Sequence, residues 1–307
     1  TLQGVRTLAK RSDKKPPTKK KNKSTDEAPS PEPMEFAERD ALLRAFAEVF
    51  GSEGLEDGAE DDRTPLDRAQ ELVFMAWEEE DELKRMMMAK VALEICPDCA
   101  DAYCLLAEDT SGILRYTIEL FAKGVAAGER AVGPDTFRDG VGGFWSRLET
   151  RPYMRARSGL AACLWEAGRD DEAIGHAWDM LRLNPDDDQG MRHILMHWLV
   201  ETHRDDEAWR LLNQYPDELS LYWECSRALL LYRKEGDSPA ARTSLKRAQK
   251  LNKHAVGFLL SPMDLPEEEP ESCRAGSEEE AVLYVTPALR SWYETPGAVE
   301  WLEERTA

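Results

Sequence analysis

Between Met154 and Pro185 the apolar residues follow a helical spacing in two successive runs. The first run consists of Leu160, Ala161, Leu164 and Trp165, and the second consists of Ala173, Ile174, Ala177, Met180 and Leu181. Spacings of three and four residues place such side chains on one face of an α-helix. The pattern therefore predicts two amphipathic helices joined by a short turn.

The residues around this turn are those that begin and end helices. Gly168 suits the end of the first helix, because glycine adopts the left-handed backbone of a helix terminus without a steric cost. Asp170 or Asp171 is expected to cap the second helix, and Asn184-Pro185 is expected to stop it. The small residues Ala161 and Ala173 fall where two antiparallel helices would cross most closely.

The same pattern recurs along the chain, at residues 66–107, 191–216 and 221–252. Ala208 takes the place of Ala173, and Gly236, Ala241, Ala248 and Asn252 follow in the same order. Paired helices of about 34 residues with small residues at the crossing resemble the tetratricopeptide repeat. The resemblance predicts an all-α fold, a tetratricopeptide-like right-handed superhelix of stacked helix–turn–helix hairpins.

Composition divides the chain into five parts. These are a disordered basic tail (1–33), a capping helix with an acidic linker (34–64), the helical repeat array (65–261), an acidic Pro-rich linker (262–276) and a C-terminal helical cap (277–307). The cap is expected to hold two helices, Ser277 to Tyr293 and Pro296 to Arg305, with Thr295 as the cap of the second. A long helical pattern at 111–130 is followed by a region at 133–149, which a loop or distorted turn at 140–143 interrupts.

A wider resemblance rests on several short stretches. They are Gly143-Phe144-Trp145, residues 149–157 and 184–190, and in the tail residues 252–256, 276–282 and 296–298 with Trp292. The first three resemble an uncharacterised bacterial and lower-eukaryote tetratricopeptide family, and the tail is similar to the suppressor-of-tumorigenicity-seven proteins. The resemblance covers roughly residues 66–302 and departs from the second family in lacking membrane segments. It implies a repeat protein of unsettled function and brings no catalytic residues.

Charge is distributed unevenly. Residues 1–23 carry a net charge of +8 and the remainder −28, within a total of −20. An acidic body of this size repels nucleic acid, so only the Lys-rich head is a candidate for weak binding to it. The six cysteines are scattered, which favours reduced thiols and an intracellular protein, cytoplasmic or nuclear. No apolar run reaches the length of about 18 residues that a membrane span needs, so no membrane association is expected.

Two pairs of residues have the spacing of metal ligands. Cys96 and Cys99 form a CxxC pair, but a structural zinc site needs four ligands and no second pair exists. His193 and His197 lie one helical turn apart without the glutamate of a zinc protease. Asp188 is better interpreted as a helix N-cap than as part of a calcium loop. We expect no metal, no cofactor and no enzymatic activity.

The function expected from this fold is protein–protein interaction, as a scaffold or adaptor whose concave groove holds a partner peptide or helix. Five residues of the first helices are expected to line that groove: Arg155, Gln189, Arg192, Trp223 and Arg233. A strip of arginines inside an acidic body suggests an acidic partner segment, or the chain's own tail around Trp301. Equally, these arginines are expected to pair with carboxylates of adjacent helices.

Two other function classes stay open. One is a nucleic-acid-associated factor held through the Lys-rich head, and the other is a metal-binding or enzymatic protein that uses the His193/His197 face.

Overall fold

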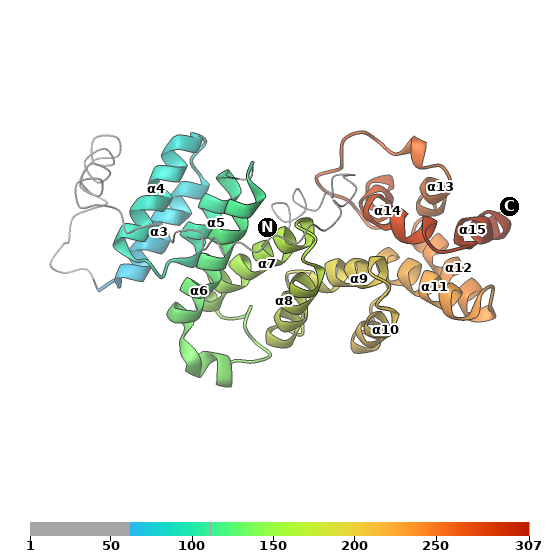
Figure 1. Cartoon of the computed structure of the whole chain (residues 1–307), viewed down its shortest axis with the longest axis horizontal. Coiled ribbons are helices and arrows are strands. Elements are labelled where there is room, and N and C mark those ends of the chain that lie inside the picture. The colour runs from blue at the N-terminus through green and yellow to red at the C-terminus, as the bar shows by residue number, and fades with distance from the viewer. Residues whose placement is uncertain (1–61, 111, 307) are drawn as a thin grey trace, which may run out of the picture. The chain divides into compact units, whose positions relative to one another are not determined.

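The computed structural model describes residues 62–110 and 112–306. Over these ranges the chain forms thirteen α-helices and no β-strand, so the all-α prediction is confirmed (Figure 1). The contacts between elements divide the chain into two compact units, with the boundary after Asp188. The predicted capping helix at 34–50 and the basic head lie outside the described residues.

The described residues of the first unit form six α-helices and one 3₁₀ turn. They are α3 (Pro65–Trp77), α4 (Glu82–Ile95), α5 (Ala100–Asp109), α6 (Leu114–Asp139), η2 (Leu148–Thr150), α7 (Arg151–Glu166) and α8 (Asp170–Leu183). Successive helices pack as the pairs α3–α4, α5–α6 and α7–α8. The first helix of each pair also contacts the first helix of the next, so α3, α5 and α7 follow one another through the unit.

Local sequence explains where α3 and α4 begin. Thr64 accepts a hydrogen bond from the backbone N–H of Asp67, whose carboxylate accepts one from the Thr64 backbone in return. This capping box satisfies two N–H groups that have no partner within the helix. The Asp81 carboxylate caps α4 by accepting from the Lys84 N–H. Helices α3 and α4 form a hairpin at the start of the range 66–107, where the sequence pattern predicts paired helices.

The turn between α7 and α8 corrects the predicted cap. Gly168 has a φ of +72°, and the N–H of Arg169 donates to the Leu164 carbonyl. This bond and the one from Gly168 N–H to the Trp165 carbonyl form a Schellman ending. Because α8 starts directly after it, the N-cap position falls on Arg169, without a side-chain cap. The prediction of Asp170 or Asp171 as the cap is wrong, and both carboxylates lie instead in the first turn.

Close packing between α6 and α7 depends on glycines that the sequence pattern did not single out. A side chain at Gly159 would collide with the ring of Phe121, and a Cβ at Gly128 would lie 2.8 Å from the Cβ of Tyr153. The helical pattern at 111–130 continues to Asp139, across a break at Gly133. The loop predicted at 140–143 is present immediately after α6.

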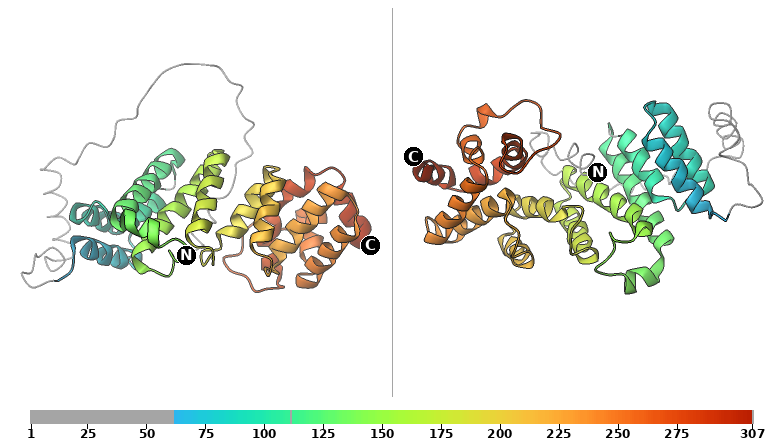
Figure 2. Two further views of the ribbon diagram at one scale, coloured as in Figure 1. Left: turned by 90° about the horizontal axis from the view of Figure 1, so that it is seen from below. Right: turned by 180° about the vertical axis from the view of Figure 1, so that it is seen from behind.

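The second unit contains the remaining seven α-helices, seen from two further sides in Figure 2. They are α9 (Met191–Glu201), α10 (Asp205–Gln214), α11 (Leu221–Glu235), α12 (Pro239–Leu251), α13 (Ala255–Leu260), α14 (Glu278–Tyr293) and α15 (Ala298–Thr306), with the 3₁₀ turn η3 (Pro262–Asp264). Helices α9–α10 and α11–α12 form pairs, and α9 contacts α11. Helices α13 and η3 were not predicted, and η3 lies within the segment expected to be a linker.

Two predicted helix starts in this unit are wrong. Helix α9 begins at Met191 after Gly190, so Asp188 lies two residues too early to cap it. Helix α15 begins at Ala298, and Pro296 therefore precedes the helix instead of occupying its first turn. The Thr295 hydroxyl is used differently, because it donates to the Ser291 carbonyl at 2.7 Å.

Candidate partner-binding surface

The five predicted groove residues divide between the two units: Arg155 is in the first, and Gln189, Arg192, Trp223 and Arg233 are in the second. Arg155 lies on α7 and reaches back to α5. Its Nε donates to Asp101 Oδ1 at 2.8 Å, and its Nη2 donates to Oδ2. Gln70 of α3 donates to the same carboxylate at 2.8 Å. Asp101 is fully buried, so these three donors offset the cost of removing its charge from water.

Two aromatic side chains of α3 remain open beside this network. Trp77 is 38% exposed and Phe74 is 53% exposed, with ring centroids 5.7 Å apart. The guanidinium carbon of Arg155 lies 5.4 Å from the centroid of the Trp77 ring. The Arg155 side chain is itself 27% exposed. We call Phe74, Trp77 and Arg155 the α3 aromatic surface.

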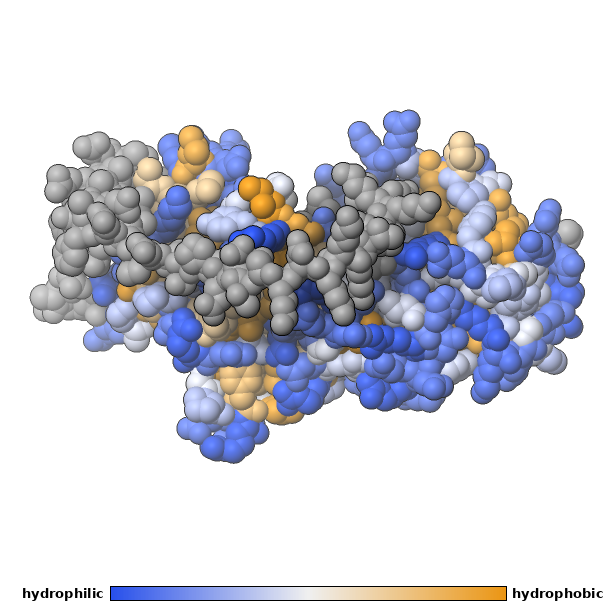
Figure 3. Space-filling model, viewed as in Figure 1, coloured by the Kyte–Doolittle hydropathy of each residue, from blue (hydrophilic) through white to orange (hydrophobic). Residues whose placement is uncertain are grey.

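Phe74 and Trp77 are not among the groove residues predicted from the sequence, although the sequence carries a signal for them. The buried residues of α3 are Ala69, Leu72, Val73 and Ala76, which form one complete helical stripe. Phe74 and Trp77 fall beside that stripe, where a soluble helix ordinarily carries polar residues. Figure 3 shows apolar atoms reaching the surface around the turn between α3 and α4, whereas hydrophilic side chains cover most of the surface over α11 and α12.

In the second unit, Arg192 and Trp223 lie near the same tyrosine. Arg192 Nη2 donates to Glu218 Oε2 at 2.8 Å, and its guanidinium carbon lies 5.4 Å from the centroid of the Tyr215 ring. Trp223 meets Tyr215 edge to face at 6.2 Å. Trp223 is fully buried and packs on His193 from the other direction. The structure thus places Trp223 in the core rather than on an open surface, because its ring fills the space between α9 and α11.

Arg233 joins α11 to three other segments. Its Nη1 donates to the Val200 carbonyl and to Asp205 Oδ1, both at 2.9 Å, and its Nε donates to Thr295 Oγ1 at 2.9 Å. Only 8% of its side chain is exposed. Gln189, just before α9, is half-buried. The expected pairing of groove arginines with carboxylates is therefore observed at Arg155, Arg192 and Arg233.

The C-terminal tail is held on another part of the second unit. Trp301 Nε1 donates to Asp237 Oδ1 at 2.7 Å, and its ring stacks on Tyr232 with centroids 4.8 Å apart. Arg242 and Arg305 bind the same carboxylate. The Arg242 guanidinium above all, then the Trp301 indole N–H and Arg305, hold the pKa of Asp237 well below its usual range.

The candidate metal ligands do not form a cluster. Burial raises the pKa of the Cys99 thiol to about 12, whereas a zinc-bound cysteine is a thiolate. His197 Nε2 lies 3.2 Å from Glu201 Oε2, and His193 packs against Tyr222 and Trp223. Among the described residues no group of three or more His, Cys, Asp or Glu side chains is placed to hold a metal ion.

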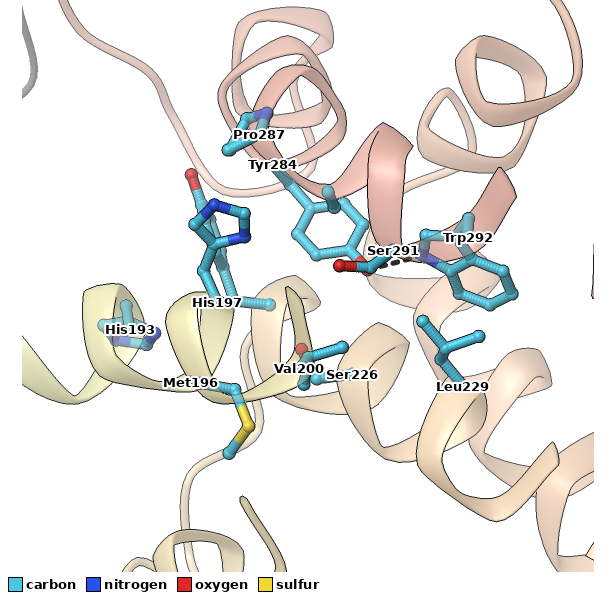
Figure 4. Close-up of a pocket in the computed structure, with 12 residues that line it drawn as sticks. His193, Met196, His197, Val200, Ser226, Leu229, Tyr284, Pro287, Ser291 and Trp292 are labelled. Atoms are coloured by element: carbon cyan, nitrogen blue, oxygen red, sulfur yellow. Dashed lines mark hydrogen bonds between the residues drawn. The ribbon is translucent and has the colours of Figure 1, made fainter. Parts of the chain in front are cut away.

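Both histidines border a small cavity in the second unit, between α9, α11 and α14 (Figure 4). Its volume is about 30 Å³, and Tyr284, Ser226 and Ser291 also line it. The dashed bond in Figure 4 joins Trp292 Nε1 to the Tyr284 hydroxyl at 3.0 Å. A space of this size admits one or two water molecules, whereas ligand pockets measure about 300–1,000 Å³.

Comparison with known proteins identifies the family of this chain. A family model described as ST7 protein matches residues 59–305, and the chain belongs to that family. The resemblance of the tail to the suppressor-of-tumorigenicity-seven proteins is thereby confirmed. No solved structure matches the chain significantly. Within the described ranges no helix is long and apolar enough to cross a membrane.

The curated relatives are longer than this chain. Protein ST7 homolog of Drosophila pseudoobscura is 26% identical over 258 residues, which are 76% of this chain and 47% of that protein. Suppressor of tumorigenicity 7 protein-like of Homo sapiens is 28% identical over 253 residues, 74% of this chain and 43% of that protein. The Protein ST7 homolog of Caenorhabditis elegans is 26% identical over 275 residues, 76% and 49% respectively. The chain spans less than half the length of these relatives.

Proposed function

We propose that the chain is a protein-interaction module whose helix pairs stack as tetratricopeptide-like repeats, with a right-handed superhelical twist. The succession of α3, α5 and α7 supports this proposal, since each is the first helix of a pair. Hydrogen bonds from Gln70 and Arg155 to Asp101 join these three helices. Ala161 and Ala173, expected at a helix crossing, are both fully buried. In this proposal the chain acts by binding and catalyses no reaction.

The observation that carries the proposal is the α3 aromatic surface. Two adjacent aromatic rings are left open on α3, beside an arginine whose position is fixed by a buried carboxylate. Tryptophan and arginine are enriched among residues that dominate binding energy at interfaces. A ring held by a rigid neighbour also loses little entropy on binding. We infer that a protein segment covers Phe74 and Trp77, and that the chain works inside the cell, where its six free cysteines remain thiols.

Site-specific photo-crosslinking in cells tests this proposal. A benzophenone amino acid replaces Trp77 in the full chain, and the control carries it at Leu148, an apolar residue on η2 that is more exposed than Trp77. We expect reproducible protein adducts from position 77 that position 148 does not form, because only the first position lies on the binding surface.

The adducts are then followed in the Phe74→Ser background. Loss of the adduct with retained folding, measured by circular dichroism, supports the proposed surface. Identical adducts from positions 77 and 148, or none at position 77, contradict it.

A further inference from the structure

We propose that the α3 aromatic surface takes a basic segment of a partner protein, in which an apolar side chain is flanked by lysine or arginine. This inference rests on the proposed binding function and adds the chemistry of the partner. It replaces the acidic partner suggested by the arginine strip in the sequence, because the structure supplies a carboxylate for the arginine of this surface.

The positive charge of Arg155 is already matched. Two of its nitrogens bind the two carboxylate oxygens of Asp101, which is fully buried. Arg85, the next arginine along the chain from α3, is likewise engaged by Asp109, with Nε at 2.9 Å and Nη2 at 2.7 Å. An acidic segment would have to compete with these carboxylates, both of which the fold already holds in place.

The glutamates next to Trp77, in contrast, are not neutralised by ion pairs with described residues. Glu78, Glu79 and Glu80 follow Trp77 directly at the carboxyl end of α3. The end of a helix dipole is itself negative there, so acidic residues at this position are unfavourable. The last turn of α3 contains no basic residue. The Glu79 carboxylate accepts a hydrogen bond from the Asp81 N–H, and the Glu79 carbonyl accepts one from Arg85. Within the described ranges Glu78 and Glu80 have no ion-pair partner.

The next two acidic residues, in contrast, lie where a negative charge stabilises a helix. Asp81 caps α4 and Glu82 lies in its first turn, so both stabilise the positive end of that helix. The fold thus accounts for Asp81 and Glu82 but not for Glu78 and Glu80. Lysine or arginine from a partner would supply the missing countercharge and could also stack on the open face of Phe74 or Trp77. An apolar partner side chain would cover the rest of the two rings.

Selection from a displayed library of random peptides of about 12 residues, with the full chain immobilised, tests the proposal. We expect the enriched peptides to combine an apolar or aromatic residue with net positive charge. We also expect a selected peptide to lose about tenfold in affinity for the Glu78→Gln/Glu80→Gln variant, since two exposed charges are removed and the Glu79 carboxylate, which accepts from the Asp81 N–H, is kept. The matched control is Glu267→Gln/Glu268→Gln, two glutamates outside any helix, which should bind within about twofold of the unmodified chain.

The possible outcomes distinguish a failure of the basic-segment inference from a failure of the proposed protein-binding function. Enriched peptides that depend on Trp77 but are neutral or acidic overturn the basic-segment inference and leave the binding function standing. Equal losses in the test variant and the control variant also overturn it, because the effect would then come from overall charge. A library that yields no peptide dependent on Trp77 overturns both.

Discussion

Arg155 holds Asp101 through two guanidinium nitrogens across 54 residues of sequence, and the carboxylate it holds is fully buried. The pair connects α7 to α5, and Gln70 extends the same network to α3. The guanidinium carbon also lies 5.4 Å from the centroid of the Trp77 ring. The Asp101 network therefore joins the three first helices and also fixes the position of the arginine in the α3 aromatic surface.

Replacing Asp101 with alanine should lower the free energy of unfolding by about 3 kcal/mol, because Arg155 would be left partly buried without its countercharge. Urea denaturation followed by circular dichroism measures the loss. Arg138→Ala is the matched control, since it removes exposed pairs with Asp135 and Asp139 and should cost less than about 0.5 kcal/mol. Equal effects of the two substitutions would show that the Asp101 network does not hold the helices together.

The turn after α9 offers a second test. His203 has a φ of +57° and occupies the same place as Gly168, with the Arg204 N–H donating to the Leu199 carbonyl. A left-handed backbone is strained for a residue with a side chain. His203→Gly should therefore raise the free energy of unfolding by about 0.5 kcal/mol, and the β-branched His203→Val should lower it by more than about 1 kcal/mol. Both are measured by urea denaturation, and the reverse order would contradict this backbone conformation.

Acid should weaken the attachment of α15. The pKa of Asp237 is lowered by Arg242, Trp301 and Arg305 in the folded chain, so its stabilising effect is complete above its unfolded pKa of about 4. That effect is lost as the pH falls through the lower folded value. The stability advantage of the unmodified chain over Asp237→Asn should therefore shrink between about pH 5 and about pH 2. An advantage that stays constant over this range would mean that the carboxylate is not bound as the structure shows.

Thiol labelling tests the environment of the CxxC pair. At about pH 8 the raised pKa of Cys99 implies a thiolate fraction roughly a thousandfold below that of an ordinary cysteine. Ellman's reagent should therefore react with exposed Cys273 first and with Cys99 only when the chain unfolds. The Cys96→Ser/Cys273→Ser variant removes the two thiols that are not buried, and adding Cys99→Ser to it identifies the Cys99 signal. Rapid reaction of Cys99 in the folded chain would restore the pair as a candidate redox or metal site.

The sequence predicts helices from local periodicity better than it predicts contacts between distant residues. The spacing around Leu164 and Ile174 is a local property, and it predicts the α7–α8 hairpin correctly. The residue at which a helix starts is harder to predict, because the Schellman ending at Gly168 moves the cap from Asp170 to Arg169. That shift is a matter of backbone geometry rather than of residue type.

The candidate surface could be predicted only in part, because it depends on contacts between residues that are far apart in the sequence. Arg155 was singled out as a cation in an acidic chain, but its partner Asp101 lies in another helix pair and no local pattern joins the two. Trp223 looked similar in sequence to an open groove residue, yet Tyr215 and His193 enclose it. Trp77 could have been found, because it falls outside a complete buried stripe on α3.

The binding affinity of a library-selected peptide for Trp77→Ala tests the central claim most directly. Fluorescence polarisation of the labelled peptide should show a loss of about 30-fold or more relative to the unmodified chain, because an exposed interface tryptophan of this kind contributes at least about 2 kcal/mol. Leu148→Ala, which removes an exposed apolar residue elsewhere in the first unit, should change the affinity by less than about twofold. An affinity for Trp77→Ala equal to that of the unmodified chain would show that partners bind elsewhere.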